Sequence, residues 1–386
     1  MSTVVVAGAL ANKPGNGGEA WVRLSWLLGL RQLGFTTYLL EQISPADCVD
    51  AAGCRTAFET SVNLAYFRQV TQDFGLSTAA SLICGNGDQI HGASASELHA
   101  IADAAVLLVN ISGNLHWPAL RRRFRRRAYV DIDPGFTQFW QAQTPGALGL
   151  EAHDLHFTIG ENIGTPACDI ATGSIAWRPT RQPVCLGDWT VSASGAPDRF
   201  TTVARWRSPF GAPEFGGRRF TAKHHEFRRV MAFPERVSQT CELALRIDAA
   251  DATDLRRLRR HGWTVVDAAS VGAPDTFREY VRTSGAEFSV AQGVYVATNS
   301  GWFSDRTVRY LASGKPALVQ NTGFDTQYPV GDGLLAFRTL DEAVAGARDI
   351  DRRYAEHSAA ARGLAERYFD AGVVLGRFAE DAGLAP

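Results

Sequence analysis

Residues 301–323 read GWFSDRTVRYLASGKPALVQNTG, and the order of residue types in this stretch predicts one helix followed by one strand. The helix is expected over 304–313, because the Ser and Asp at its start can cap the first free N–H groups. Gly314 ends the helix, and the apolar residues 317–320 form the strand. We expect the start of the helix and the end of the strand to border one ligand site.

The first 40 residues show the same alternation of strand and helix. Residues 4–8 form a short apolar strand, residues 19–33 have helical spacing, and residues 36–40 form a second strand. Right-handed crossover makes the sheet of this βαβ unit parallel. The loop between strand and helix contains Gly17 and Gly18, where backbone N–H groups at a helix start attract phosphate. It matches neither GxGxxG nor GxxxxGK[ST], so a dinucleotide fingerprint and a Walker P-loop are disfavoured.

The strand and helix patterns continue to the end of the chain. Further strands are predicted at 81–84, 105–109, 128–132, 200–204, 242–247 and 264–266, and further helices at 252–260, 275–283, 339–352, 354–367 and 371–382. A stretch rich in Pro and Gly, near Asp188, separates two such series. The sequence predicts two doubly wound α/β domains, residues 1–187 and 188–370, that face each other across a ligand cleft.

Composition limits the classes of function. The 386 residues include 39 Lys and Arg against 40 Asp and Glu, so the net charge is −1 and a charged ligand needs a local cluster. The six cysteines form no CxxC or zinc-type spacing and are expected to be reduced thiols. The start is not a signal peptide, and no apolar run reaches about 18–20 residues. These features predict a cytoplasmic protein without integral membrane association.

The segment 301–323, with its core Arg-Tyr-Leu-Ala-Ser-Gly-Lys-Pro, resembles the donor-binding segment of two-domain GT-B glycosyltransferases. The glycine-rich first loop and a final helix also fit this family. The resemblance implies two Rossmann-like domains, the first for the acceptor and the second for the nucleotide-sugar donor, with residues 371–386 crossing back to the first. The chain lacks a Glu-x7-Glu signature, because Glu287 is followed eight residues later by Tyr295. The first loop also lacks the His that is the base in many inverting members.

The same resemblance implies a set of donor-binding residues. The phosphates would contact Arg306 and the N–H groups of Ser304 and Asp305. Arg207 and Lys223 would neutralise the charge of the leaving diphosphate, the main electrostatic task of the reaction. The full predicted set is Gly17, Gly18, Arg207, Lys223, Trp302, Ser304, Asp305, Arg306, Gln320, Asn321 and Thr322, the last three beside the sugar. GT-B enzymes use side chains and helix ends here, so we expect no cofactor and no obligatory metal.

A general base is expected on the first-domain side of the cleft, because an acceptor hydroxyl must lose a proton. Asp133 follows a strand and precedes Pro134, which places it at a carboxyl edge of the sheet. The other candidates for this role are Glu19, His153, His156 and Glu161. Asp131 and Asp133 also form a DxD pattern on one face of the chain, so a Mg²⁺ site is an alternative.

The run from Arg121 to Arg127 holds six arginines in seven residues. Alone it suggests binding to a phosphate backbone, and its other interpretation is a solvated helix end. Because the net charge is near zero and no nucleic-acid module is present, we do not expect nucleic acid as a partner.

The sequence predicts a glycosyltransferase of the hexosyl type, acting on a hydroxyl or amine of a small molecule or glycan. A nucleotide-sugar epimerase and a non-catalytic sugar-nucleotide or nucleic-acid binding protein are the alternatives. The donor, the stereochemistry and the oligomeric state stay open.

Overall fold

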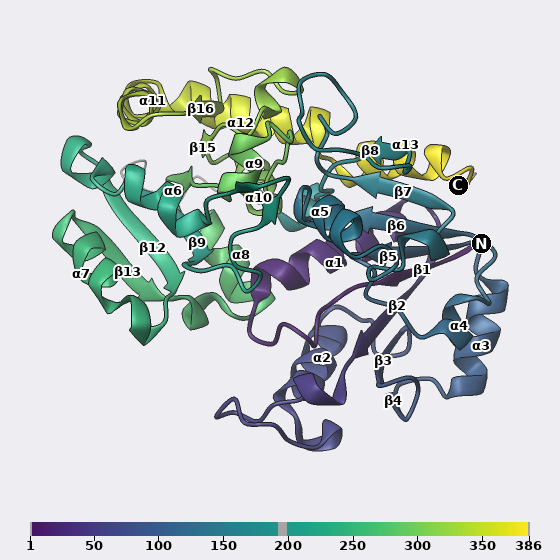
Figure 1. The fold of residues 1–386 in the computed structure, drawn as a ribbon. Coiled ribbons are helices and arrows are strands. Elements are labelled where there is room, and N and C mark those ends of the chain that lie inside the picture. Colours follow the sequence, from purple (N-terminus) through teal and green to yellow (C-terminus); the bar gives the residue numbers. More distant parts are fainter. Residues whose placement is uncertain (1, 192–198, 385–386) are drawn as a thin grey trace.

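The computed structural model describes residues 2–191 and 199–384. Helices pack around two large sheets in this part of the chain (Figure 1). The first sheet has the strand order β4-β3-β2-β1-β5-β6-β7-β8 and is parallel except for the β3–β4 pair. Its strands are β1 (Thr3–Ala7), β2 (Thr36–Ile43), β3 (Ala80–Cys84), β4 (Gln89–His91), β5 (Leu107–Ile111), β6 (Arg127–Asp131), β7 (Leu155–Thr158) and β8 (Trp177–Pro179). Helices cover both faces, which is why these strands read as apolar runs and not as alternating patterns.

The second sheet has the strand order β13-β12-β9-β14-β15-β16 and is parallel throughout. Its strands are β9 (Arg199–Arg205), β12 (Thr240–Arg246), β13 (Trp263–Asp267), β14 (Ala286–Ser289), β15 (Ala317–Gln320) and β16 (Leu334–Phe337). Counted from β9, this is the doubly wound order 3-2-1-4-5-6, and the six inner strands of the first sheet repeat it. The predicted pair of Rossmann-like units is confirmed.

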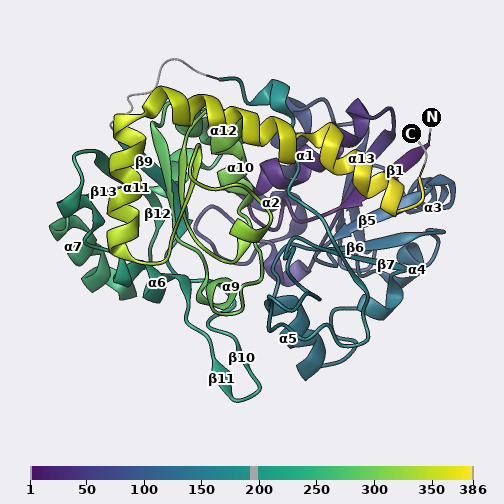
Figure 2. The ribbon, with the colours of Figure 1, turned by 90° about the horizontal axis from the view of Figure 1, so that it is seen from above.

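Helices and one hairpin complete the described elements. In the first half they are α1 (Gly17–Gln32), α2 (Val62–Asp73), α3 (Ala95–Ala104), α4 (Pro118–Arg121) and α5 (Phe136–Gln143). In the second half they are α6 (Lys223–Arg229), α7 (Ala252–Arg260), α8 (Pro274–Arg282), α9 (Gly293–Ala297), α10 (Asp305–Ala312), α11 (Leu340–Arg352), α12 (Tyr354–Tyr368) and α13 (Ala371–Asp381). The hairpin of β10 (Glu214–Phe215) and β11 (Arg218–Arg219) projects beside α5 (Figure 2). Across residues 2–191 and 199–384, no helix has the length and apolar character needed to cross a bilayer.

Alternate residues of each central strand supply separate cores. Val4 and Val6 of β1 pack in the core that includes α1, whereas Val5 packs on the opposite face with Leu98 of α3. This period of two follows from strand geometry. A core with helices on both faces holds the strand ends at fixed positions, and those ends carry the site described below.

The last helix packs on the first half, as predicted. Figure 2 shows α12 running from the second half into α13, which lies along α1. Phe378 of α13 packs its ring 4.9 Å from Trp26 and 4.5 Å from Phe157. A Cβ on Gly29 would lie 2.6 Å from Leu375 Cδ1, so the glycine permits the close approach of the two helices.

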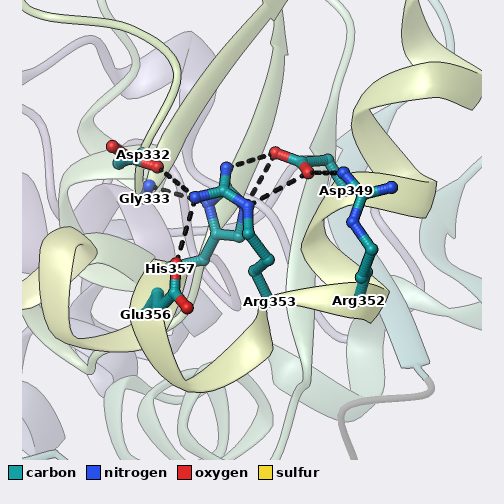
Figure 3. Close-up of polar contacts among 7 residues, drawn as sticks. All are labelled: Asp332, Gly333, Asp349, Arg352, Arg353, Glu356 and His357. Atoms are coloured by element: carbon teal, nitrogen blue, oxygen red, sulfur yellow. Dashed lines mark hydrogen bonds and ion pairs between the residues drawn. The ribbon is translucent and has the colours of Figure 1, made fainter.

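A polar cluster fixes the turn between α11 and α12 (Figure 3). Arg353 bonds Asp349 on one side and contacts Asp332 at 2.9 Å on the other. The fully buried His357 lies beside them: its Nδ1 accepts from the backbone of Gly333 at 3.0 Å, and its Nε2 lies 3.1 Å from Asp349. The cluster sets the direction in which α12 leaves the second sheet.

Among the predicted bounds that differ from the observed ones, two have a clear local reason. The strand predicted at 105–109 begins at Leu107, because the N–H of Ala105 still bonds Ile101 as the cap of α3. The first helix begins at Gly17, two residues earlier than predicted, because the side chain of Asn16 accepts from the N–H of Glu19 and caps it.

Candidate active site between the two sheets

The carboxyl ends of the first sheet touch loops of the second half. Asn162 follows β7 and makes this contact: its Nδ2 donates to the carbonyl oxygens of Asn299 and Gly323, both at 3.0 Å. Its Oδ1 accepts from Thr326 at 3.1 Å and from Gln327 at 3.0 Å. The two halves therefore meet at the sheet edge where ligand sites of α/β folds lie.

Asp133 lies at this boundary, half-buried, two residues after β6. Its N–H donates to Asp131 Oδ1 at 3.0 Å, and Gly135 with a φ of 90° turns the chain into α5. The hydroxyl of Tyr295, from α9 of the second half, donates to Asp133 Oδ1 at 3.2 Å. Burial raises the pKa of Asp133 to about 6, although the charge of Lys13 opposes the rise. A carboxylate with this pKa can accept a proton near neutral pH.

Asp131 holds the backbone of Asp133 in place. It is fully buried, and its two oxygens accept hydrogen bonds from Thr137 at 2.7 Å, Gln138 at 3.0 Å, Thr158 at 2.7 Å and the N–H of Asp133 at 3.0 Å. The DxD pair therefore does not present two free carboxylates. Within the described residues, no group of three or more His, Cys, Asp and Glu side chains is placed to hold a metal ion.

Glu19, the other predicted catalytic carboxylate, lies between two cations. It contacts Lys13 Nζ at 2.9 Å and also pairs with Arg23. Burial raises its pKa, but the charges of Lys13 and Arg23 outweigh burial and lower the pKa to about 2. Glu19 is thus a much weaker base than Asp133 and is held as an ion-pair partner.

Lys223 brings a cation to the boundary at the start of α6. Burial, followed by the charge of Arg306, lowers the pKa of its ammonium to about 8, and the charge of Asp133 is among those that oppose the fall. In the described part of the chain, its Nζ has neither a hydrogen bond nor an ion pair. This half-buried ammonium is available to an anionic ligand.

Arg306 is bonded inside the second sheet. Its Nε donates to Glu287 Oε1 at 2.6 Å, Nη1 to the carbonyl of Val203 at 2.8 Å and Nη2 to Ser289 Oγ at 2.8 Å. Glu287 is fully buried and balances its charge. Because Val203 lies on β9 and Glu287 on β14, the guanidinium fills the switch point of this sheet. Three of its five N–H donors are therefore used within the protein, and the phosphate contact of Arg306 stays a prediction.

Gly17 and Gly18 allow close packing between the halves. A Cβ on Gly17 would lie 2.4 Å from the carbonyl oxygen of Ala273, and one on Gly18 would lie 3.1 Å from the ring of Phe277. Trp21 of α1 donates from Nε1 to the carbonyl of Pro274 at 2.9 Å. The structure thus uses this glycine pair to seat α1 against α8.

Ser304 and Asp305 lie at the start of α10. Ser304 caps α10 by accepting from the N–H of Arg306 at 3.2 Å. Asp305 pairs at 2.9 Å with the buried Arg309. Burial lowers the pKa of this guanidinium, and the charges of Asp305 and Glu19 are among those that oppose the fall. The predicted residues Ser304 and Asp305 are therefore brought to the same boundary as Glu19.

The residues predicted beside the sugar shape the loop that carries Trp302. Gln320 Oε1 accepts a backbone N–H at 3.1 Å, Asn321 Oδ1 accepts another at 2.7 Å, and Thr322 Oγ1 donates to the carbonyl of Trp302 at 2.5 Å. The indole of Trp302 stacks on Tyr295 at 4.6 Å. This loop supports the tyrosine that reaches Asp133.

Arg207 and the other base candidates are held in local contacts. Arg207 forms a bidentate pair with Asp251 at 2.6 Å while half-exposed, and its role beside Lys223 stays a prediction. The remaining base candidates form hydrogen bonds with neighbouring residues. His153 bonds Asn110 and the carbonyl of Gly149, His156 bonds the carbonyl of Leu150, and Glu161 bonds Arg181 and Tyr328. None of these contacts includes Asp133.

The arginine run lies between α4 and β6, at the amino end of β6, whereas Asp133 follows its carboxyl end. Arg127 pairs with Asp154 at 2.9 Å, and Arg123 pairs with Asp103. The run is therefore outside the candidate site.

Three residues of the site were missed by sequence reasoning. Tyr295 is the residue eight positions after Glu287, where the Glu-x7-Glu pattern fails. Glu41 accepts from the N–H groups of Ala11 at 2.5 Å and Asn12 at 2.8 Å and so holds the first loop. A charged residue inside the apolar strand β2 is the sequence signal that points to Glu41. Asn162 has no sequence signal.

Comparisons with known proteins identify the fold of the chain. No protein-family model and no curated protein matches the chain. A solved α-glucosyltransferase with UDP and a DNA 13-mer matches with a TM-score of 0.63 at 8% identity, covering 99% of this chain and 100% of the other. HepE from Anabaena with UDP and glucose matches with a TM-score of 0.61 at 10% identity and 99% and 100% coverage. A putative UDP-N-acetylglucosamine 2-epimerase from Listeria monocytogenes matches with a TM-score of 0.50 at 13% identity and 99% and 96% coverage. The chain has the GT-B fold.

Proposed function

We propose that the chain is a nucleotide-sugar-dependent glycosyltransferase of the hexosyl type. The observation that carries the proposal is the approach of two groups to the same boundary: Asp133, with a pKa of about 6, and Lys223, whose ammonium has no bonded partner among the described residues. The two groups come from opposite halves, and the charge of Asp133 is among those that oppose the fall in the pKa of Lys223. HepE and the α-glucosyltransferase carry UDP in their solved structures, which supports UDP-sugars as the first donors to test.

In the proposed reaction, the acceptor oxygen or nitrogen attacks C1 of the sugar while the bond from C1 to the diphosphate oxygen breaks. The acceptor proton passes to the carboxylate of Asp133, and the diphosphate leaves with its charge balanced by Lys223. A single displacement of this kind inverts the configuration at C1. The four hydrogen bonds that occupy Asp131 support a reaction without an obligatory metal.

The test is a transfer assay with UDP-sugars and a panel of hydroxyl and amine acceptors, read by mass spectrometry and by the anomeric proton signal. We expect an inverted glycoside from the wild type and very little from Asp133→Asn. The matched control Asp103→Asn, at a surface ion pair, should retain activity. Epimerised donor formed without an acceptor would contradict transfer, and a product of retained configuration would contradict Asp133 as the base.

A further inference from the structure

A second candidate ligand site lies in the first half, along α5. One face of α5 packs toward the second half, where Phe139 stacks on Phe215 with ring centroids 4.6 Å apart. A different face, with Gln138 and Gln141, lines a cavity of about 500 Å³. Every residue that lines this α5 cavity belongs to the first half. Small-molecule sites typically have volumes of about 300–1,000 Å³.

Two polar atoms of the lining residues have no partner. Trp177 of β8 packs nearly perpendicular to His156, at 5.7 Å, and its Nε1 is buried without a hydrogen bond to any described residue. Gln141 donates from Nε2 to Glu151, which leaves its Oε1 buried and also without a partner in the described chain. The donor Nε1 of Trp177 thus lacks an acceptor, and the acceptor Oε1 of Gln141 lacks a donor. Both residues line the same cavity. A hydroxyl group can satisfy either, because it both donates and accepts.

The charge of the lining argues against phosphate. The lining residues include the carboxylate of Glu151 but no Lys or Arg. Backbone hydrogen bonding lowers the pKa of Glu151, so the group is ionised at neutral pH. An anion would meet this carboxylate with no balancing cation, in contrast to the surroundings of Lys223.

We propose that the α5 cavity binds a neutral saccharide. The indole of Trp177 offers a flat apolar surface to the C–H groups of a sugar ring, while amide and indole groups can bond its hydroxyls. The residues of the cavity are distinct from Asp133 and Lys223, and binding requires no nucleotide. The inference therefore stands or fails separately from the proposed transferase activity.

The test is saturation-transfer difference NMR of the full chain with methyl α-D-glucopyranoside and maltotriose, without nucleotide. We expect saturation of the sugar protons in the wild type. Gln141→Leu and Trp177→Phe, each of which removes one polar group and keeps most of the packing, should weaken binding at least tenfold. Trp140→Phe, on the face of α5 that packs with Phe210, is the matched control and should bind as the wild type does.

Circular dichroism and the melting temperature of each variant separate loss of binding from loss of folding. Absence of saturation transfer to both sugars in the wild type would overturn the proposal. So would unchanged affinity in both folded variants, or tighter binding of glucose 1-phosphate than of the neutral glucoside. UDP affinity, measured on the same variants, should not change.

Discussion

The hydroxyl of Tyr295 donates a hydrogen bond to Oδ1 of Asp133 at 3.2 Å, although 162 positions separate the two residues in the chain. Asp133 follows the first sheet, and Tyr295 lies in α9 beside the second. Burial and the nearby carboxylate hold the pKa of Tyr295 well above its usual value, so the tyrosine stays neutral and donates. A bond donated to a carboxylate favours its charged form. The second half therefore tunes the candidate base of the first.

The pH dependence of transfer should follow Asp133. Because only the carboxylate accepts a proton, kcat/KM should rise as the pH increases through about 6. Tyr295→Phe removes a contact that lowers the pKa of Asp133, so the midpoint of this rise should move to higher pH. Steady-state rates between pH 5 and 8 give both midpoints. An unchanged midpoint in the variant would show that Tyr295 does not tune the base.

Replacing the base should affect chemistry more than binding. Asp133→Asn keeps the shape and polarity of the side chain but removes its basicity, so kcat should fall by about 10²–10⁴-fold. The affinity for UDP, measured by calorimetry, should stay within about twofold, since Asp133 contacts the acceptor in this account. A near wild-type kcat in Asp133→Asn would show that another group is the base.

The sequence located part of this site for a definite reason. Asp133 could be predicted as a candidate because it follows an apolar strand and precedes Pro134 and Gly135, and the carboxyl end of a strand in an α/β sheet is a known place for chemistry. Its partner Tyr295 could not be predicted, because the contact depends on how two independent sheets pack. Glu19 is paired locally, because Lys13 and Arg23, the latter four residues on in the same helix, lower its pKa to about 2. Arg306 is paired by a residue of another element, Glu287 on β14.

Replacing Arg306 should reduce the stability of the protein more than it reduces UDP binding. Arg306→Met leaves Glu287 buried without its partner, which should lower the free energy of unfolding by about 3–5 kcal/mol. The double variant Arg306→Met/Glu287→Met removes both charges and should recover most of that loss. Urea unfolding monitored by fluorescence measures all three proteins. If the single variant is as stable as the wild type but loses UDP affinity, Arg306 contacts the phosphates after all.

The ion pair of Arg306 and Glu287 also explains why one strand of the second sheet was not predicted from the sequence. Strand β15 is found at the predicted residues 317–320, because four apolar or uncharged residues follow a clear helix stop. Strand β14, Ala286–Ser289, was not predicted: it is four residues long and carries Glu287 at its centre. A buried charge in a strand is tolerated only with a partner, and that partner lies 19 positions away.

The cluster at the turn between α11 and α12 should contribute to stability. His357→Ala removes the acceptor for the N–H of Gly333 in a fully buried place, and unfolding should require about 1–3 kcal/mol less. Arg352→Ala is the matched control in the same cluster: its side chain is 71% exposed, and the change should stay within about 0.5 kcal/mol. Equal effects in chemical denaturation would contradict the importance of the buried histidine.

In the proposed reaction, Lys223 receives the diphosphate of a nucleotide sugar at the boundary of the two sheets. Isothermal titration of UDP into the wild type, Lys223→Met and the exposed control Arg260→Met tests it most directly. We expect the wild type and the control to bind UDP, and Lys223→Met to bind it at least about tenfold more weakly. Wild-type binding should also weaken as the pH rises above about 8, where the ammonium loses its proton. Equal affinity of Lys223→Met and the wild type, or no binding of UDP, GDP, ADP or dTDP by the wild type, would contradict it.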